Sequence, residues 1–420
     1  MKGIDLKTPN SVLIKTTFDE MIARWTVIGY YSPYAVDNMK MTDLGTLRSI
    51  ELFLSDIERI RTDIFIKRGD SLRNTSNGFK VCTQFHPTVY AKKWFPFKFL
   101  FNDILIYSES SSYHFREVSR RFIALFSLFN LNIKELVQDG NEMEILQPLW
   151  VDDPEQKVDP IRLSLFNQKM RKVDNFNQLN DSDMMSINVI ISNYREVFKG
   201  SKIINRLDYN FYKKRNNYIE YFLTLLNQYN GLFIFSINFY IKNDYKTFNL
   251  PQIKKDFFNT LRSKQEFSIL VGYMGTWEFC EHYGYFFRVL FFVPRKKIND
   301  YNELFDNLIH TWETFGYSKK EMRDQPTYEA ELSNISESNI NLRTPYSVIG
   351  KKNQTLISAF IDSVINYTTL CEKYFFPAEL QMFIFEHMLD NKKEKALGGK
   401  FIIDSLKSGF SRSFRGHIKN

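Results

Sequence analysis

The sequence has few cysteines and no long apolar run. Its 420 residues include only Cys82, Cys280 and Cys371, which lie far apart and form no Cys-x-x-Cys pair. A sparse, odd set argues against a disulfide framework or a zinc ribbon and is typical of a reducing compartment. No apolar stretch reaches the roughly 18 residues of a membrane span, and the N-terminal residues lack the apolar run of a signal peptide. We therefore expect a cytoplasmic protein without a membrane partner.

Short motifs of several enzyme classes are also missing. There is no Gly-x-Ser-x-Gly elbow and no Gly-x-x-x-x-Gly-Lys-[Ser/Thr] phosphate loop, and "ALGGKFIIDSL" has the wrong spacing for one. The six histidines include no pair at i, i+2 or i, i+4, so no two-histidine zinc motif is present. Cys280 and His282 form a lone Cys-x-His. Two turn residues explain that pair more simply than half of a metal site.

The composition is that of a basic globular protein. Hydrophobic residues make up 44%, so the chain can bury a core in two or three domains. The net charge is +8, and residues 391–420 hold eight lysines or arginines against two acids. This balance fits nucleic acid or an anionic membrane surface. The closing "KSGFSRSFRGHIKN" interleaves cations with Phe410 and Phe414, a pattern that suits phosphates and unpaired bases, although a basic terminus without a partner fits it equally well.

The pattern of apolar residues divides the chain. Residues 1–136 are predicted to be a helical N-terminal domain, with one helical stripe formed by Leu47, Ile50, Leu54, Ile57 and Ile64. Residues 137–185 contain three prolines, a cluster of acids and an Asn-rich stretch, which predict a linker region. Residues 186–390 are predicted to be an α+β domain, and residues 391–420 a basic tail.

Within the α+β domain the period changes from helical to strand-like at Gly231. The predicted order from there is strand, helix, strand, strand, helix, loop, helix. The fold class is therefore α+β: a helical N-terminal region followed by an antiparallel sheet with helices on one face.

This order of segments resembles one family of replication proteins. "FIFSINF" is followed by "VGYMGTWEF" with Glu278 at an acidic position, and then by "YGYFFRVLFF" with a Gly-Tyr pair at the mouth of a hairpin. "LIHTWETFGY" then carries Trp312, "SVINYTTLCEKY" carries Tyr367, and "RSFRGHIK" closes the series. Across residues 200–417 this order is similar to the inovirus-type replication initiators and their YagK/YfjJ-like prophage relatives.

The resemblance implies an HUH-type nuclease domain, in which two histidines on a central strand hold a divalent metal and a tyrosine attacks the scissile phosphate. Here the two histidine positions are Phe286 and Arg288. Phenylalanine has no ligand atom, and arginine is a cation without an acceptor. The resemblance leaves Tyr367 as the nucleophile and Glu278 and His282 as residual metal ligands. No cofactor is expected unless the nuclease is active, in which case the metal is Mg²⁺ or Mn²⁺.

These features predict a replication-initiator-like, Rep-like DNA-binding protein of a phage, prophage or plasmid element, whose metal-dependent nicking is lost or reduced. The predicted partners are single-stranded or origin DNA and host replication proteins. The residues predicted to contact DNA are Arg288, Lys407, Arg412, Arg415 and Lys419. Two alternatives stay open. One is an active rolling-circle enzyme that nicks and ligates single-stranded DNA through Tyr367. The other is a non-enzymatic protein-interaction module, because residues 1–200 resemble no family.

Overall fold

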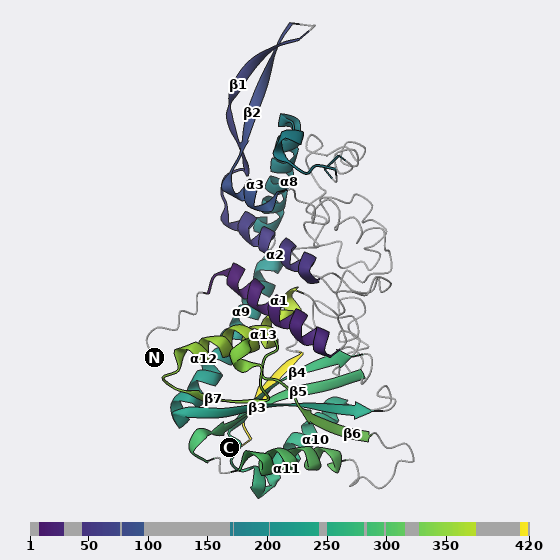
Figure 1. The fold of residues 1–420 in the computed structure, drawn as a ribbon, viewed down its shortest axis with the longest axis vertical. Coiled ribbons are helices and arrows are strands. Elements are labelled where there is room, and N and C mark those ends of the chain that lie inside the picture. Colours follow the sequence, from purple (N-terminus) through teal and green to yellow (C-terminus); the bar gives the residue numbers. More distant parts are fainter. Residues whose placement is uncertain are drawn as a thin grey trace. The chain divides into compact units, whose positions relative to one another are not determined.

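The computed structural model describes residues 8–28, 44–75, 78–95, 169–170, 172–200, 202–242, 250–280, 284–297, 300–315, 327–374 and 412–418. The chain forms two compact units, one of Met1–Met41 with Tyr209–Asn420 and one of Thr42–Asp208. Figure 1 shows the helices and strands of both units. Mixed helix and antiparallel sheet confirm the α+β class.

An antiparallel sheet of six strands is the centre of the first unit. The strands run in the order β6-β3-β5-β4-β8, and β7 also pairs with β3. Central β3 pairs with β7 through its first half and with β6 through its second half. The strands are β3 (Gly231–Lys242), β4 (Gly272–Cys280), β5 (Gly284–Pro294), β6 (Thr327–Leu332), β7 (Tyr346–Gly350) and β8 (Ser413–Gly416).

Helices cover both faces of this sheet (Figure 1). On one face, odd-numbered side chains of β3 and β5, such as Phe239 and Phe287, pack against α10 (Leu250–Ser263) and α11 (Tyr301–Glu313). On the other face, even-numbered side chains pack against α9, α12 and the π-helical turn that follows α12. The bounds of these elements are α9 (Lys202–Tyr229), α12 (Gln354–Ala359) and the π-helical turn Phe360–Ile365.

The prediction of helices on one face alone was therefore wrong. All eleven residues of β5 are buried. Both alternating sets of side chains along β3 and β5 contain large apolar residues, so each face has to be covered. Helix α13 (Asn366–Tyr374) continues the layer over the second face, and α1 (Asn10–Val27) packs against α13. Helix α1 thus belongs to the sheet unit, although residues 1–136 were predicted as a separate domain.

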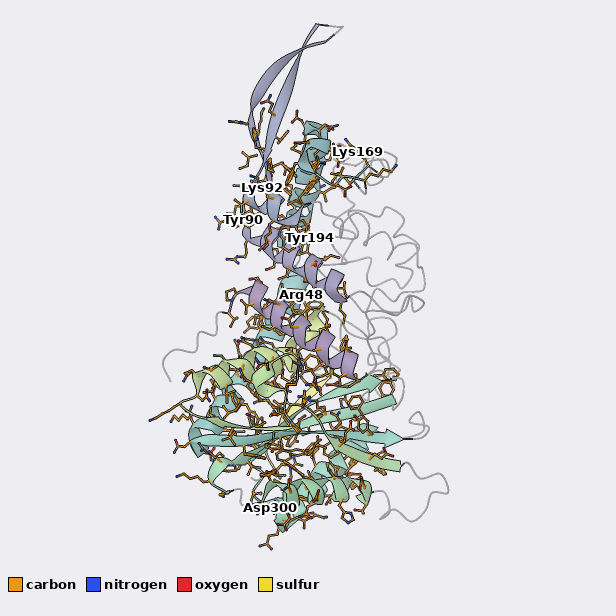
Figure 2. All side chains as sticks on the ribbon, viewed as in Figure 1. Arg48, Tyr90, Lys92, Lys169, Tyr194 and Asp300 are labelled. Carbon is orange, nitrogen blue, oxygen red and sulfur yellow. The ribbon has the colours of Figure 1, made fainter. Side chains whose placement is uncertain are left out.

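Side-chain caps and one left-handed residue set the ends of several helices. Asp300 begins α11 by accepting hydrogen bonds from the backbone N–H groups of Asn302 (2.9 Å) and Glu303 (3.2 Å), and Figure 2 labels it. Asn353 caps α12 in the same way. Asn230 has φ 57 and turns the chain from the end of α9 into β3.

The second unit combines helices with a long hairpin. It contains α2 (Leu44–Arg59), β1 (Phe65–Thr75), β2 (Gly78–Pro87), α3 (Val89–Trp94) and α8 (Asp181–Gly200). The predicted stripe is buried from Leu47 to Ile57 in α2, and Ile64, just beyond the helix, is buried too. Within this unit the hairpin extends beyond the helices (Figure 1). The hairpin lies in the region predicted to be helical.

The base of the hairpin is fixed to α8 by polar contacts. The side chain of Asn188 accepts a hydrogen bond from the backbone N–H of Phe65 (3.1 Å) and donates one to its carbonyl (2.7 Å). Asp181 accepts from the N–H of Phe85 (3.2 Å). An isolated two-stranded ribbon is marginally stable in water, so these contacts give the hairpin its support.

Candidate functional site

One end of the helix-covered second face of the sheet is polar. At the β7 end this face carries Leu232, Ile234 and Phe292, which join an apolar core. Away from the β7 end, the alternation of side chains along β3, β4 and β5 places five polar residues on the same face: Ser236, Asn238, Thr276, Glu278 and Arg288. All five are buried. Buried polar and charged groups are costly unless they are paired, so this end of the sheet is the candidate site.

Arg288 lies at the centre of the polar end and is 1% exposed. Its Nε donates to Ser236 Oγ at 3.0 Å, and its Nη2 donates to the carbonyls of Asn334 (3.1 Å) and Ile335. Burial lowers the pKa of Arg288 to about 10, so the guanidinium stays charged at neutral pH. A permanent cation with no acceptor atom occupies the second position at which the resemblance implies a metal ligand.

Phe286 takes the first of those positions. It is fully buried and contacts Tyr240, with ring centroids 4.9 Å apart. Tyr240 donates to Glu331 at 2.5 Å and accepts from the amide of Asn238 at 2.9 Å. This position is therefore filled by aromatic packing and offers no metal ligand.

Glu278 is the one acid that β4 places at the polar end. Its Oε1 accepts a hydrogen bond from Thr276 at 2.9 Å and lies 3.9 Å from Arg412 Nη2. Within the described part of the chain, its Oε2 has no hydrogen-bond partner. Its carboxylate lies close enough to Arg288 to favour the charged form of that guanidinium.

Tyr367, on α13, points its hydroxyl into the same cluster. The hydroxyl accepts hydrogen bonds from Arg412 Nη2 at 2.6 Å and from Trp25 Nε1 at 3.0 Å. The residue is 0% exposed, and burial raises the pKa of Tyr367 well above its ordinary value. Tyr367 is therefore a neutral phenol, enclosed by Trp25 on one side and Arg412 on the other.

Arg412 connects the last strand of the sheet to this cluster. It precedes β8, donates through Nε to the Trp277 carbonyl at 2.7 Å, and contacts the Cys371 sulfur through Nη1. Its guanidinium lies 5.0 Å from the centroid of the Tyr367 ring. Burial raises the pKa of the Cys371 thiol to about 12, so this cysteine is an uncharged packing group.

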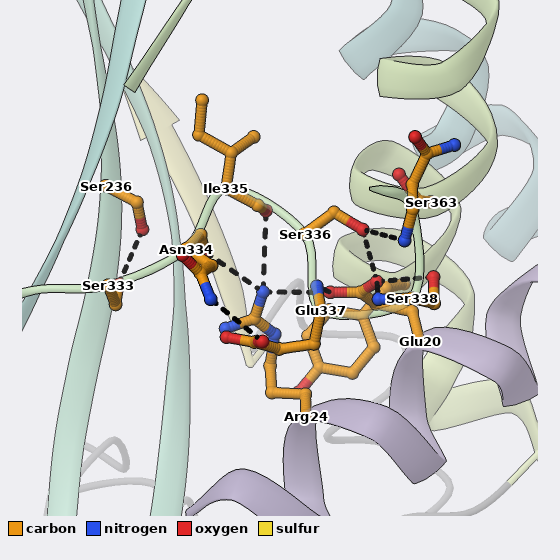
Figure 3. A network of polar contacts seen from close by, with 12 residues as sticks. Glu20, Arg24, Ser236, Ser333, Asn334, Ile335, Ser336, Glu337, Ser338 and Ser363 are labelled. Carbon is orange, nitrogen blue, oxygen red and sulfur yellow. Dashed lines mark hydrogen bonds and ion pairs between the residues drawn. The ribbon is translucent and has the colours of Figure 1, made fainter. Parts of the chain in front are cut away.

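Helix α1 covers the cluster with two charged residues and one tryptophan. Glu20 and Arg24 pair at 2.8 Å, one helical turn apart, and Trp25 reaches Tyr367. Although burial alone would lower the pKa of Arg24, the carboxylates of Glu20 and Glu278 raise it above its ordinary value. Figure 3 shows the charged pair against the segment that joins β6 to β7.

The structure brings four of the predicted site residues together: Glu278, Arg288, Tyr367 and Arg412. In this arrangement Arg288 and Arg412 are each 1% exposed and do not reach solvent. Arg415 is separate and exposed, with its guanidinium over the rings of Tyr218 (5.2 Å) and Tyr221 (4.9 Å) of α9. The other three predicted residues, His282, Lys407 and Lys419, lie outside the described residues.

Sequence reasoning missed the contribution of α1. The signal was available, because Glu20 and Arg24 share a helical stripe with Leu13 and Thr17, all of them buried. Charged residues inside a buried stripe mark a polar network, since they are almost never buried unless paired. The segment between β6 and β7 gave no comparable signal, because its serines and asparagines resemble those of any loop.

Comparison with family models, with curated proteins and with solved structures finds no match. In the ranges that the structure describes, no three His, Cys, Asp or Glu side chains lie close enough to hold a metal ion. No helix among those residues is long and apolar enough to cross a bilayer.

Proposed function

We propose that this protein is a replication-initiator-like DNA-binding protein of a phage, prophage or plasmid element, in which metal-dependent nicking is lost or reduced. One arrangement supports it most: Arg288, Glu278 and Tyr367 meet on one face of an antiparallel sheet. The resemblance requires such a meeting of the metal-bearing strand, its acidic neighbour and the tyrosine helix. If Tyr367 lay far from β5, the resemblance would not support this proposal.

The chemistry of the cluster favours binding over metal-assisted cleavage. Arg288 repels a metal ion at the place where a neutral imidazole would bind it, and one carboxylate, Glu278, is a poor metal site by itself. Guanidinium groups instead suit phosphate, which they bind through two parallel hydrogen bonds. The cluster is thus suited to an anion.

The exposed face of β8 offers a cation that can meet DNA without any rearrangement. The Arg415 guanidinium lies over the rings of Tyr218 and Tyr221, and the residue is exposed, so its charge is open to a phosphate. Residues 391–420, which include β8, carry a net charge of +6. Phosphate contacts of this kind make affinity for DNA strongly dependent on salt.

The test is a salt titration of binding to a fluorescent single-stranded oligonucleotide, read by anisotropy between about 50 and about 200 mM salt. We expect the logarithm of the affinity to fall linearly with the logarithm of the salt concentration. Arg415→Ala should reduce the slope by about 0.7, the value of one phosphate contact on a single strand. Lys255→Ala, which removes an exposed cation from α10, is the matched control. Affinity that hardly changes with salt would refute DNA binding.

A second candidate function is active nicking through Tyr367, favoured by the closeness of this tyrosine to Glu278. We expect no covalent product, because the phenol is neutral and because Phe286 and Arg288 supply no metal ligand. The measurement is incubation with single-stranded DNA and Mn²⁺, followed by denaturing electrophoresis. An adduct that disappears in Tyr367→Phe would show that nicking survives.

A further inference from the structure

The segment between β6 and β7 holds the carboxylate of Glu20 as a protein holds a bound anion. Two hydroxyl groups donate to it, Ser336 Oγ at 2.6 Å and Ser338 Oγ at 2.7 Å. Two successive backbone N–H groups, those of Glu337 and Ser338, donate at 2.9 and 3.0 Å. Figure 3 shows these contacts around Glu20. We call residues Ser336–Ser338 the anion loop.

The donors of the anion loop are general for oxyanions. Successive backbone N–H groups in a turn form concavities that bind phosphate in many proteins, and hydroxyl groups add further donors. Although burial alone would raise the pKa of Glu20, Arg24 and the anion loop lower it. The loop therefore favours an ionised occupant over a neutral one.

A second cation adjoins the loop from the sheet. Arg288 Nη2 donates to the carbonyls of Asn334 and Ile335, which directly precede the loop, and Glu20 lies close enough to favour the charged form of Arg288. The loop also carries an acid, Glu337, whose carboxylate accepts from the Asn334 amide at 3.1 Å. That carboxylate lies close enough to Arg24 to favour the charged form of the Arg24 guanidinium.

The present occupancy leaves buried polar atoms unsatisfied. Arg24 Nε and Glu278 Oε2, both on residues at most 2% exposed, have no hydrogen-bond partner among the described residues. Such atoms are rare in native proteins and are costly, because they have lost water without a replacement. An incompletely satisfied buried ion network is also weak support for stability. The buried network that α1 closes is therefore incompletely satisfied by its own polar groups.

We propose that the anion loop, with Arg288, is a phosphate-binding site that Glu20 occupies as an internal mimic of the ligand. The ligand is a phosphodiester group of single-stranded DNA, an identity that rests on the proposed function. Trp25, one residue beyond Arg24, covers the Tyr367 hydroxyl. Withdrawal of α1 therefore frees the anion loop and opens Arg288 and Tyr367 to the same strand of DNA.

The first experiment measures the affinity of Glu20→Gln for a single-stranded oligonucleotide at constant salt. The amide keeps the shape of the side chain but removes the charge that competes with phosphate. We expect binding about tenfold or more tighter than that of the natural protein, because hydrogen bonds to an ionised group are lost from the closed form. Glu313→Gln, an exposed acid on α11, is the charge-matched control and should behave as the natural protein. Unchanged or weaker binding by folded Glu20→Gln overturns the proposal.

The second experiment tests the site without DNA and uses sodium phosphate as the probe. The melting temperature is compared in phosphate and in chloride at equal ionic strength. Phosphate should raise the melting temperature of Glu20→Gln. It should not raise the melting temperature of the natural protein or of the triple variant, in which Glu20→Gln is combined with Ser336→Ala and Ser338→Ala. The same rise in Glu20→Gln and in the triple variant overturns the site. If phosphate raises the melting temperature of Glu20→Gln alone and none of the three proteins binds DNA, the phosphate site is supported and only the proposed function is refuted.

The third measurement needs no variant and therefore does not depend on the folding of Glu20→Gln. Amide hydrogen exchange of residues 10–27 is followed in the natural protein with and without single-stranded DNA. DNA should accelerate exchange in α1, because binding at the anion loop displaces Glu20. Unchanged protection of α1 in a protein saturated with DNA overturns the proposal.

Discussion

At the scale of single residues, the polar end of the sheet is dominated by buried arginines. Arg24, Arg288 and Arg412 are each at most 2% exposed. Arg24 donates to the carboxylate of Glu20 and shares the carbonyls of Asn334 and Ile335 with Arg288. Arg288 also donates to a serine, whereas Arg412 donates to a carbonyl, a thiol and a phenol. Arginine suits this role because its planar fork serves several acceptors at once and keeps its charge when buried.

The ionisation of Glu20 should make the stability of the sheet unit sensitive to acid. The pKa of Glu20 lies below its ordinary value of 4.5 in the folded protein, so its contribution is fully present above pH 4.5 and is lost as the pH falls through the folded pKa. Below pH 4.5 we expect the free energy of unfolding of the natural protein to fall more steeply than that of Glu20→Gln, by at most about 1.4 kcal/mol per pH unit. Urea unfolding at a series of pH values measures both slopes.

Glu313→Gln again serves as the control, because it removes the charge of an exposed acid on α11, away from the anion loop. It should retain the steeper slope. Identical slopes for Glu20→Gln and the natural protein would mean that the anion loop does not favour the ionised carboxylate.

At the scale of elements, helix α1 and the β1–β2 hairpin each depend on contacts with an element distant in the sequence. Helix α1 brings Glu20, Arg24 and Trp25 to the sheet from a position more than 200 residues earlier in the sequence than β3. The β1–β2 hairpin depends in the same way on α8, because a ribbon of two strands has no second layer of its own.

Asn188→Ala should loosen the base of that hairpin. Both backbone polar groups of Phe65 would lose their partner while the residue stays buried, at a cost of about 2 kcal/mol. Hydrogen exchange of the amides in β1 and β2 measures the free energy of opening. Val189→Ala, at an adjacent and 40% exposed position of α8, should leave exchange unchanged. Equal exchange in the two variants would show that the hairpin is held by other contacts.

At the scale of the whole molecule, the boundary between units does not follow the order of the sequence. The sheet unit takes its first helix from Met1–Met41 and the rest from Tyr209–Asn420, with the second unit inserted between them. The basic C-terminal segment is part of the sheet unit as well, because β8 pairs with β4 at the edge. The predicted domains, which ran consecutively along the chain, differ from this division for that reason.

Much of the sheet unit was predictable from the sequence, because the apolar pattern of a strand or helix is contained in its own residues. The strands β3, β4 and β5 and the helices α10 and α11 have strong apolar patterns, and each lies where it was expected. Strands β6, β7 and β8 were missed, because they are short and polar and are defined by the partners that they meet. The β1–β2 hairpin was missed because its sequence has no apolar alternation strong enough to mark a ribbon.

The candidate site likewise has one part that was predicted from the sequence and one part that only the structure shows. Glu278, Arg288 and Tyr367 were identified through the resemblance, from the order of the segments that carry them. Their closeness to Glu20, Arg24 and the anion loop depends on contacts between residues more than 300 positions apart in the sequence, which no local pattern contains.

The sequence by itself determined the α+β class, the central strands, and the presence of phenylalanine and arginine at positions where the resemblance implies metal ligands. Only the tertiary structure decided that Arg288 is buried, that α1 covers Tyr367, and that Glu20 occupies the anion loop. The physical reason is the range of the interactions. Side-chain periodicity acts over a few residues, whereas the pairing of buried charges is set by which distant segments the core brings together.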